Sequence, residues 1–294
     1  MSIAMWLTIL LNGLCTGSLF GLVSAAFSFQ FGALRMMNFA YGAFVMVGMY
    51  AMYLGVHVVG VDILTIIPLL LVFYFFLGYA LRATLLKSSD PNVQIIITSG
   101  VALLLESLIL FIAGAMPRNI LNSIPPTWKI PLDGGMVIIS QLNVLTLIVS
   151  TAVLVGFAIF LKRTWLGMSI RAVVQQSEAA SLMGVDSAKI VSIGFGISFI
   201  ITSISSVMIS LQFILEPTSG HYYQLIGFLV CVIAGMGNLK GGFYAGLLVG
   251  LISAMANTFM AQWHDAIIFI LFVLILTCRP NGVFVSKKSI SRSV

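Results

Sequence analysis

The chain has 294 residues, of which 60% are hydrophobic and 7% are charged, and its formal net charge is +6. Because a soluble domain carries about 25% charged residues, this composition excludes a fold whose whole surface faces water. The basic balance does not predict a nucleic-acid partner, since the Lys and Arg residues stand between hydrophobic segments, where they set membrane orientation.

The apolar stretches are continuous and about 20 residues long, which is the length of a helix that crosses a bilayer. Barrel strands would instead alternate apolar and polar residues over about ten positions. We therefore predict an all-α integral membrane protein, a polytopic bundle of about eight to nine transmembrane helices with some broken at glycines. These helices are expected to form a single transmembrane domain over residues 1–294.

Apolar segments follow one another along the chain. In order, they are expected at 5–29, 36–56, 62–81, 94–116, 138–161, 188–213, 223–237, 241–260 and 265–278. The first basic residue is Arg35, so the basic region of a cleavable signal peptide is missing and the first segment is expected to remain as a span. The seventh segment is short for a full span, which indicates a half-helix or a tilted, broken element.

Basic residues predict the orientation, because they are enriched on the cytoplasmic side of membrane proteins. If the segments alternate as spans, only Arg118 and Lys129 fall on one side. The residues on the richer side are Arg35, Arg82, Lys87, Lys162, Arg163, Arg171, Lys189, Lys240, Arg279, Lys287, Lys288 and Arg292. The N-terminus is then outside, and the tail at 279–294 is cytoplasmic.

Two loops stand out by their length. The outer loop at 117–137 is rich in proline and is expected to be an external segment with many turns. The inner loop at 162–189 has no proline, and apolar residues recur in it at helical spacing opposite polar ones. The apolar residues are Ile170, Val173 and Val174, and the polar ones are Arg171, Gln175 and Glu178.

The inner loop is therefore expected to be an amphipathic hairpin. Ser177 is expected to cap a second short helix that ends before Gly184, and Asp186 or Ser187 is expected to cap the next span. Two interpretations fit this pattern. The hairpin docks a partner protein, or it lies on the headgroups of the membrane lipid.

The sequence predicts neither a catalytic nor a metal site. The phosphate-binding pattern GxxxxGK[ST] is missing, so the chain is not expected to bind ATP. His57, His221 and His264 are far apart, each in a predicted outer loop, and no two have the spacing of metal ligands on a helix. The three cysteines stand singly within apolar runs and are expected to be small buried hydrophobic residues.

Glu106 is the acidic residue that lies deep in a predicted span, and no basic partner is evident at that depth. A charge at the bilayer centre costs about 2.5–3.5 kcal/mol on insertion scales, so such residues usually face the bundle or a cavity. Glu106 therefore lines the substrate path, or it is protonated and bonded to a neighbouring helix.

Small residues are concentrated in several segments. Gly42 and Gly48 lie in the second segment, and Gly242 and Gly246 stand four residues apart in the eighth. Such residues permit close packing of helices. They also suit a pathway made from broken helices, whose exposed backbone lines a cavity.

Three stretches together resemble the branched-chain amino-acid/amide permease family of ABC importers, along nearly the whole chain. The first is LRMMNFAYGAFVMVGMY, with the Asn-Phe-Ala-x-Gly pattern at residues 38–42. The second is GMSIRAVVQQSEAASLMGVD, which is similar to the family's cytoplasmic coupling segment, and the third is RPNGVF at 279–284. Tyr41 stands where the family commonly has histidine, and Gln176 where it often has an acidic residue or asparagine.

This resemblance implies the permease subunit of an importer in a bacterial inner membrane. The importer would move branched-chain or other small amino acids by alternating access. Its expected partners are a second permease that is related but different, two cytoplasmic P-loop ATPases and an extracytoplasmic binding protein. ATP and Mg²⁺ would be bound by the ATPases, and this chain would hold no cofactor. The alternatives are a permease for urea or short amides, and a secondary transporter, which would need several buried charges.

The resemblance also assigns residues. Those that would couple the hairpin to the ATPase are Gly167, Arg171, Ala172, Gln176, Glu178, Ala180 and Gly184. Among these, Arg171 and Glu178 are expected to make the polar docking contacts, and Gly184 the turn back to the membrane. Residues expected along the translocation pathway are Asn38, Tyr41, Gly42, Glu106, Gly242 and Gly246.

Overall fold

Continuous apolar sequence becomes helix because lipid offers no water to bond the backbone, so each segment satisfies its own polar groups. The computed structural model describes every residue except 1–2, 89, 121–125, 133–134, 280–281 and 285–294. Within that part of the chain, eight helices are long and apolar enough to cross a membrane. The prediction of a mostly helical, multi-spanning protein is therefore confirmed.

The chain forms two compact units. The first holds residues 1–28, 123–152 and 226–294, and the second holds 29–122 and 153–225. The division between them falls within two helices, α5 (Gln141–Arg163) and α9 (Ser219–Ala234). With 16 residues, α9 is about 24 Å long and shorter than the hydrocarbon core of about 30 Å. The expectation of a short seventh apolar segment is confirmed.

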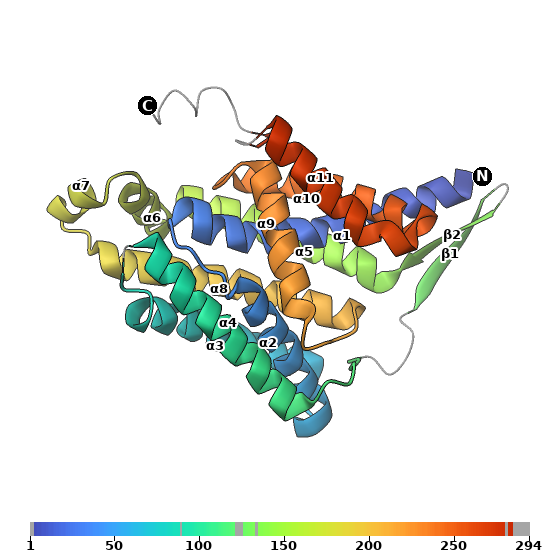
Figure 1. Cartoon of the computed structure of the whole chain (residues 1–294), viewed down its shortest axis with the longest axis horizontal. Coiled ribbons are helices and arrows are strands. Elements are labelled where there is room, and N and C mark those ends of the chain that lie inside the picture. Colours follow the sequence, from blue (N-terminus) through green and yellow to red (C-terminus); the bar gives the residue numbers. More distant parts are fainter. Residues whose placement is uncertain (1–2, 89, 121–125, 133–134, 280–281, 285–294) are drawn as a thin grey trace. The chain divides into compact units, whose positions relative to one another are not determined.

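In the first unit, α1 (Ile3–Ser28) lies along α10 (Leu239–Phe259) (Figure 1). A short 3-10 helix, η3 (Ala261–Trp263), leads into α11 (His264–Cys278), which packs on α10. Glycines at four-residue intervals face each other between α1 and α10. They are Gly13, Gly17 and Gly21 on α1 and Gly242, Gly246 and Gly250 on α10.

The glycine stripe brings two helix backbones into direct contact. A Cβ atom on Gly246 would lie 2.7 Å from the carbonyl oxygen of Gly17 and still closer to the backbone of Gly21. Residues four apart share one face of a helix, and at Gly17, Gly246 and Gly250 the nearest atoms of the opposite helix all belong to its backbone. This geometry favours the packing interpretation of Gly242 and Gly246.

The proline-rich region predicted as a loop contains a β-hairpin. Strands β1 (Thr127–Leu132) and β2 (Gly135–Ser140) pair antiparallel, from Thr127 opposite Ser140 to Leu132 opposite Gly135. Val137 and Ile139 are buried against Ala4 of α1, so the alternating pattern of β2 directs one face toward that helix. The hairpin adds a small sheet to the mostly helical structure.

The end of the described chain folds back on the turn between α9 and α10. The amide of Val283 donates to the carbonyl of Ile233 at 2.8 Å, and the side-chain amide of Asn238 donates to the carbonyl of Phe284 at 3.1 Å. Asn238 also caps α10 by accepting from the amide of Gly241 at 3.0 Å. Val283 and Phe284, the last two residues of the motif, therefore hold this turn.

In the second unit, α3 (Ile63–Thr84) and α2 (Tyr41–Leu54) pack on α8 (Ser187–Gln212), and α4 (Pro91–Ala113) packs on α2. Two π-helical turns adjoin these helices, η1 (Phe29–Ala33) and η2 (Gly55–Val59). Two further short helices, α6 (Trp165–Gln175) and α7 (Ser177–Leu182), lie between α5 and α8. Figure 1 shows α7 at the end of this unit, beyond α8.

Candidate functional site

The Asn-Phe-Ala-Tyr-Gly stretch forms a bend between η1 and α2. The buried side chain of Asn38 donates to the Gln30 Oε1 atom at 2.9 Å and accepts from the Ala40 amide at 3.1 Å. The Gln30 side chain in turn donates to the Ser198 Oγ atom of α8 at 2.9 Å. This chain of buried amides fixes the bend, and Asn38 does not line the pocket described below.

Replacing Asn38 by alanine is expected to lower the stability of the protein. The change leaves the Gln30 amide oxygen without the Asn38 donor, and a buried polar group left unsatisfied costs about 1–3 kcal/mol. The thermal unfolding midpoint of the purified protein in detergent should fall by several degrees. Asn92→Ala, at an exposed position on α4, is the matched control and should leave the midpoint unchanged. Equal midpoints for the two variants would contradict the structural role of Asn38.

α4 holds the same bend from its other side. The amide of Met37 donates to the Gln94 Oε1 atom at 2.9 Å, and the amide of Phe39 donates to the Thr98 Oγ1 atom at 3.0 Å. Gln94 and Thr98 are four residues apart and therefore share one face of α4. The backbone at Phe39 is fixed by these bonds, while its side chain remains 45% exposed.

Tyr41 and Gly42 begin α2 and anchor it to two other helices. Tyr41 is buried and its hydroxyl is in hydrogen-bond contact with Thr202 of α8. The amide of Gly42 donates to the Gln224 Oε1 atom of α9 at 2.7 Å, and a Cβ atom on Gly42 would lie 2.7 Å from the Gln224 Cβ atom. The glycine thus lets the start of α2 meet the first turns of α9.

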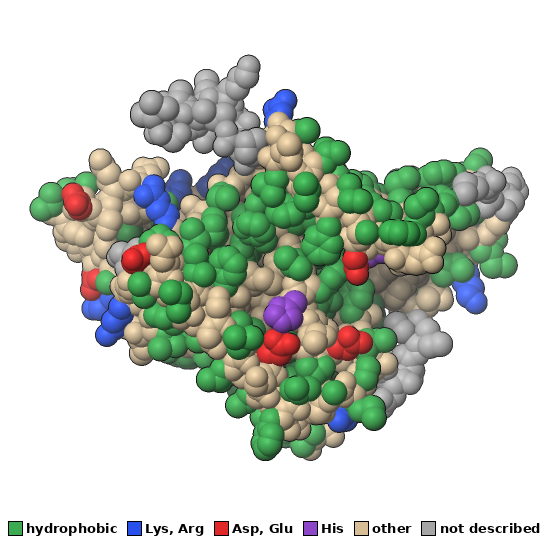
Figure 2. All heavy atoms as spheres, in the orientation of Figure 1, with side chains coloured by type: hydrophobic (Ala, Val, Ile, Leu, Met, Phe, Trp, Pro, Cys, Tyr) green, Lys and Arg blue, Asp and Glu red, His purple; other side chains and the backbone are tan. Residues whose placement is uncertain are grey.

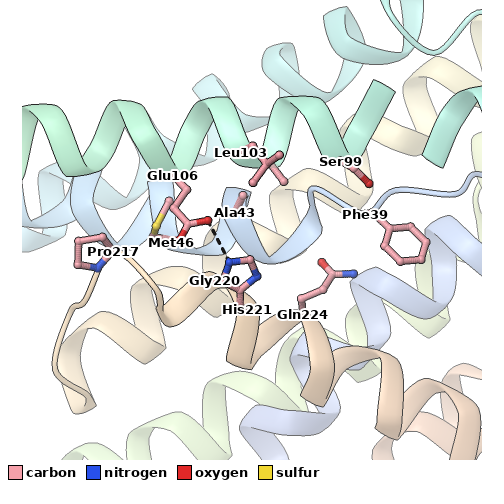
Figure 3. A pocket seen from close by; sticks show the side chains of 11 residues that line it. Phe39, Ala43, Met46, Ser99, Leu103, Glu106, Pro217, Gly220, His221 and Gln224 are labelled. Atoms are coloured by element: carbon pink, nitrogen blue, oxygen red, sulfur yellow. Dashed lines mark hydrogen bonds and ion pairs between the residues drawn. The ribbon is translucent and has the colours of Figure 1, made fainter. Parts of the chain in front are cut away.

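A pocket of about 280 Å³ opens beside this contact. Figure 3 shows that α4 contributes Glu106 and Leu103, and that α9 contributes His221 and Gln224. The residues that line the pocket are Phe39, Ala43, Met46, Ser99, Ala102, Leu103, Glu106, Pro217, Gly220, His221 and Gln224. The pocket is mainly apolar, with a few polar groups that converge from α4 and α9, a combination typical of small-molecule sites.

Glu106 and His221 meet in this pocket. The Glu106 Oε2 atom lies 3.0 Å from the His221 Nε2 atom, and the two side chains are 26% and 65% exposed, respectively. Glu106 lies about two turns before the end of α4 at Ala113, whereas His221 is in the first turn of α9. The short helix α9 therefore begins at a level well inside the length of α4.

This arrangement corrects the expected position of His221 and identifies a partner for Glu106. His221 was expected in an outer loop, but it belongs to α9, and Glu106 has a partner that was not expected. The pair is separated by 115 residues, and no local pattern connects positions so far apart. The feature of the sequence that could have indicated this pair is a histidine near the start of an unusually short apolar helix. Gln224, one turn further along α9, was missed for the same reason.

The other residues predicted for the pathway lie elsewhere. Gly242 and Gly246 belong to the first unit and face α1, as described above. Within the second unit, the structure brings together Gly42 and Glu106 at or beside the pocket, with Asn38 and Tyr41 buried behind them.

The predicted amphipathic hairpin at 162–189 is present as α6 and α7. Thr164 caps α6 by accepting from the amide of Gly167 at 3.0 Å. A Cβ atom on Gly167 would lie 2.6 Å from the Leu161 Cα atom, so this glycine lets α6 fold back against the last turn of α5. Ile170 and Val173 are buried, as their helical spacing predicted.

The turn that ends α7 is formed at Gly184. Its φ angle of 83° lies in the left-handed region that glycine adopts without strain. The Gly184 amide donates to the Ser181 carbonyl at 3.0 Å, and the Val185 amide donates to the Ala180 carbonyl at 3.1 Å. These two bonds make a Schellman motif, so the structure has a turn at Gly184, where the sequence predicted one.

The caps of the hairpin agree with the sequence in part. Asp186 caps α8 by accepting from the Lys189 amide at 3.1 Å, as predicted. Ser177, however, is the first residue of α7 rather than its cap, and Gln176 occupies the N-cap position in an extended conformation. The expected role of Ser177 was wrong, because the break between α6 and α7 is one residue earlier than the sequence indicated.

The remaining coupling residues differ in exposure. Ala172, Gln176 and Glu178 are exposed, whereas Ala180 is buried. The exposed Arg171 guanidinium turns back to the Lys162 carbonyl near the end of α5, at 3.4 Å. This contact places a positive charge at the negative end of the α5 dipole.

The tip of the hairpin presents two apolar side chains that the sequence-based interpretation missed. Leu182 is 88% exposed and Met183 is 85% exposed. In Figure 2, charged side chains gather over α6 and α7, whereas the face over α4 is largely hydrophobic. Exposed apolar residues rimmed by polar ones are found where a protein contacts a partner or a membrane surface. The sequence could have indicated this apolar tip, because Leu182 and Met183 stand immediately before the turn glycine, Gly184.

Comparisons with known proteins cover nearly the whole chain. A family model described as "Branched-chain amino acid transport system / permease component" matches residues 9–276. The high-affinity branched-chain amino acid transport system permease protein BraD of Pseudomonas aeruginosa is 25% identical over 290 residues, which cover 93% of this chain and 94% of that protein. LivH of Escherichia coli, a protein of the same description, is 22% identical over 291 residues, with coverage of 92% and 93%. No solved structure matches the chain.

Proposed function

The chain belongs to the family of permease components of branched-chain amino acid transport systems, and from this premise we propose that it forms the membrane path of an importer for branched-chain or other small amino acids. It is a multi-pass membrane protein and an ABC permease subunit, and such subunits are not catalytic. The observation that carries the proposal is the family match over residues 9–276.

In this proposal the chain works as one permease domain with separate partner chains. Two P-loop ATPases bind ATP and Mg²⁺ and drive transport, a second, related permease completes the path, and a binding protein delivers the substrate. The hairpin of α6 and α7 supports ATPase docking, because its buried face holds it on the unit while Leu182 and Met183 remain exposed at the tip. Closure of the ATPases would move the hairpins and switch the spans between two states.

The proposed location is a bacterial inner membrane, with the N-terminus outside and the C-terminus in the cytoplasm. The uneven distribution of Lys and Arg supports this orientation. It places the hairpin at the cytoplasmic end of α8, where ATPases are available. It also places the end of α4 at Ala113 outside, so that Glu106 lies in the outer half of the membrane.

The pocket that contains Glu106 is the proposed part of the translocation pathway in the second unit. Asn38, Tyr41 and Gly42 would hold the start of α2 against α8 and α9 and so keep its shape. Gly242 and Gly246 would contribute by permitting α10 to lie on α1.

The first experiment is to extract the tagged chain from native membranes in mild detergent and to identify its stoichiometric companions by mass spectrometry. We expect a second permease and P-loop ATPases to be recovered with it. Repeated recovery of the chain alone, from membranes shown to contain such ATPases, would contradict the proposal and favour an ion-coupled secondary transporter.

A further inference from the structure

The pocket between α4 and the start of α9 holds an acid and a base that are already bonded to each other. We propose that an α-amino acid binds here by separating the Glu106–His221 pair, so that each of its two charged groups contacts one of these side chains. In the occupied state, the substrate ammonium binds the Glu106 carboxylate and the substrate carboxylate accepts a hydrogen bond from the His221 Nε2–H group. This inference rests on the proposed function, and it names the site and the chemistry of recognition.

The charges of the pocket explain why a zwitterion fits. In a membrane, an acidic side chain without a partner is costly, and the 3.0 Å contact with His221 provides that partner. A zwitterion that enters between the two side chains gives each of them a new partner of suitable charge or hydrogen-bonding type. Urea or a short amide has no ionic group, so such a molecule would offer Glu106 and His221 only neutral hydrogen bonds in place of their contact.

The carboxylate end of the substrate is assigned to α9. His221 and Gln224 are three residues apart and therefore face the same direction, and both line the pocket (Figure 3). The Gln224 Oε1 atom accepts from the Gly42 amide at 2.7 Å, which leaves its amide nitrogen as the donor for a ligand. Both side chains stand in the first two turns of α9, where the helix dipole also favours a negative group.

The rest of the pocket suits an apolar side chain. Phe39, Ala43, Met46 and Leu103 form its apolar lining. Its volume of about 280 Å³ is near the lower end of the range for small-molecule sites, which is about 300–1,000 Å³. A single small amino acid with an aliphatic side chain therefore matches both the size and the lining.

The test measures substrate binding by the assembled importer in nanodiscs. Saturation-transfer NMR, which detects weak ligands, compares L-leucine with 4-methylpentanamide, a neutral analogue of similar shape. We expect the wild-type complex to bind leucine in preference to the amide. Glu106→Gln and His221→Gln should each weaken leucine binding by at least about tenfold, the loss expected when one partner of a charged hydrogen bond is removed. Glu216→Gln, an exposed carboxylate outside the pocket lining, is the matched control and should bind as the wild type does.

A second variant distinguishes substrate recognition by the pair from a purely structural contact between α4 and α9. The exchange Glu106→His with His221→Glu keeps an acid–base pair but reverses its direction relative to the apolar lining. If the pair had only a structural role, this exchange should bind leucine as the wild type does, whereas the proposal predicts binding weakened by at least about tenfold. Wild-type affinity in the exchange variant, or in both single variants, would overturn the proposal.

The failure of this inference is distinguishable from failure of the proposed function. Leucine uptake into vesicles by the same variants is measured in parallel with stimulation of ATP hydrolysis by the loaded binding protein. Normal leucine uptake by both single variants would overturn the role of the pair while leaving the importer intact. Absence of ATP-driven uptake of any small amino acid by the wild-type complex would instead overturn the proposed function itself.

Discussion

Gly246→Leu is expected to prevent the normal packing of α1 on α10. A Cβ atom at this position already lies 2.7 Å from the Gly17 carbonyl oxygen, so a leucine side chain must push two backbones apart. Overpacking of a core costs about 1–3 kcal/mol, and here the obstacle is backbone that cannot rotate away. We expect a several-fold lower membrane level of the protein and a lower thermal midpoint, measured by immunoblot and by unfolding in detergent.

The same substitution at Gly100 and Gly156 provides matched controls. Both are helical glycines where a Cβ atom would meet nothing within 4 Å, so a leucine there adds side chain without a clash. These variants should retain the wild-type membrane level and midpoint. If Gly246→Leu were equally well tolerated and impaired only substrate uptake, Gly246 would belong to the pathway rather than to the packing between α1 and α10.

The double variant Leu182→Asp with Met183→Asp is expected to lose transport while remaining inserted and folded. Both side chains are almost fully exposed at the tip of the hairpin, so their replacement removes few contacts within the chain. Burial of an apolar side chain of this size contributes about 1.5–3 kcal/mol, and loss of two such contacts should greatly weaken ATPase docking. We expect substrate uptake to fall by at least about tenfold and recovery of the ATPase with the tagged permease to fall with it.

The control for this prediction exchanges the two residues, as Leu182→Met with Met183→Leu. It keeps the apolar tip and should retain uptake and ATPase recovery. Normal uptake by the aspartate variant, with normal ATPase recovery, would show that the tip of α7 does not anchor the partner. The docking role would then have to rest on the exposed polar residues of the hairpin, such as Gln176 and Glu178.

Local features of the fold could be predicted well from the sequence. Apolar length alone predicts the long helices and the shortness of α9, because the bilayer sets the length of a span. Helical spacing predicts the buried Ile170 and Val173, and the left-handed preference of glycine predicts the turn at Gly184. Each of these depends on neighbours within a few residues along the chain.

Pairings between distant segments could not be predicted in this way. The β-hairpin was missed, because the turn residues and prolines of 117–137 obscure two short strands that pair with each other, the second of which packs on α1. The spacing of the glycines in α10 could be recognised in the sequence, but only the structure shows that they meet the glycines of α1.

The sequence by itself determined that this protein is a helical membrane protein with an amphipathic hairpin, since hydrophobic length, helical period and turn chemistry are properties of the local chain. Only the tertiary structure decided that Glu106 faces His221 and Gln224 across a pocket, and that Asn38 stands behind that pocket as a buried support. The physical reason is that a charge in a membrane must find its partner in space, and that partner was brought to α4 by a short helix more than a hundred residues away.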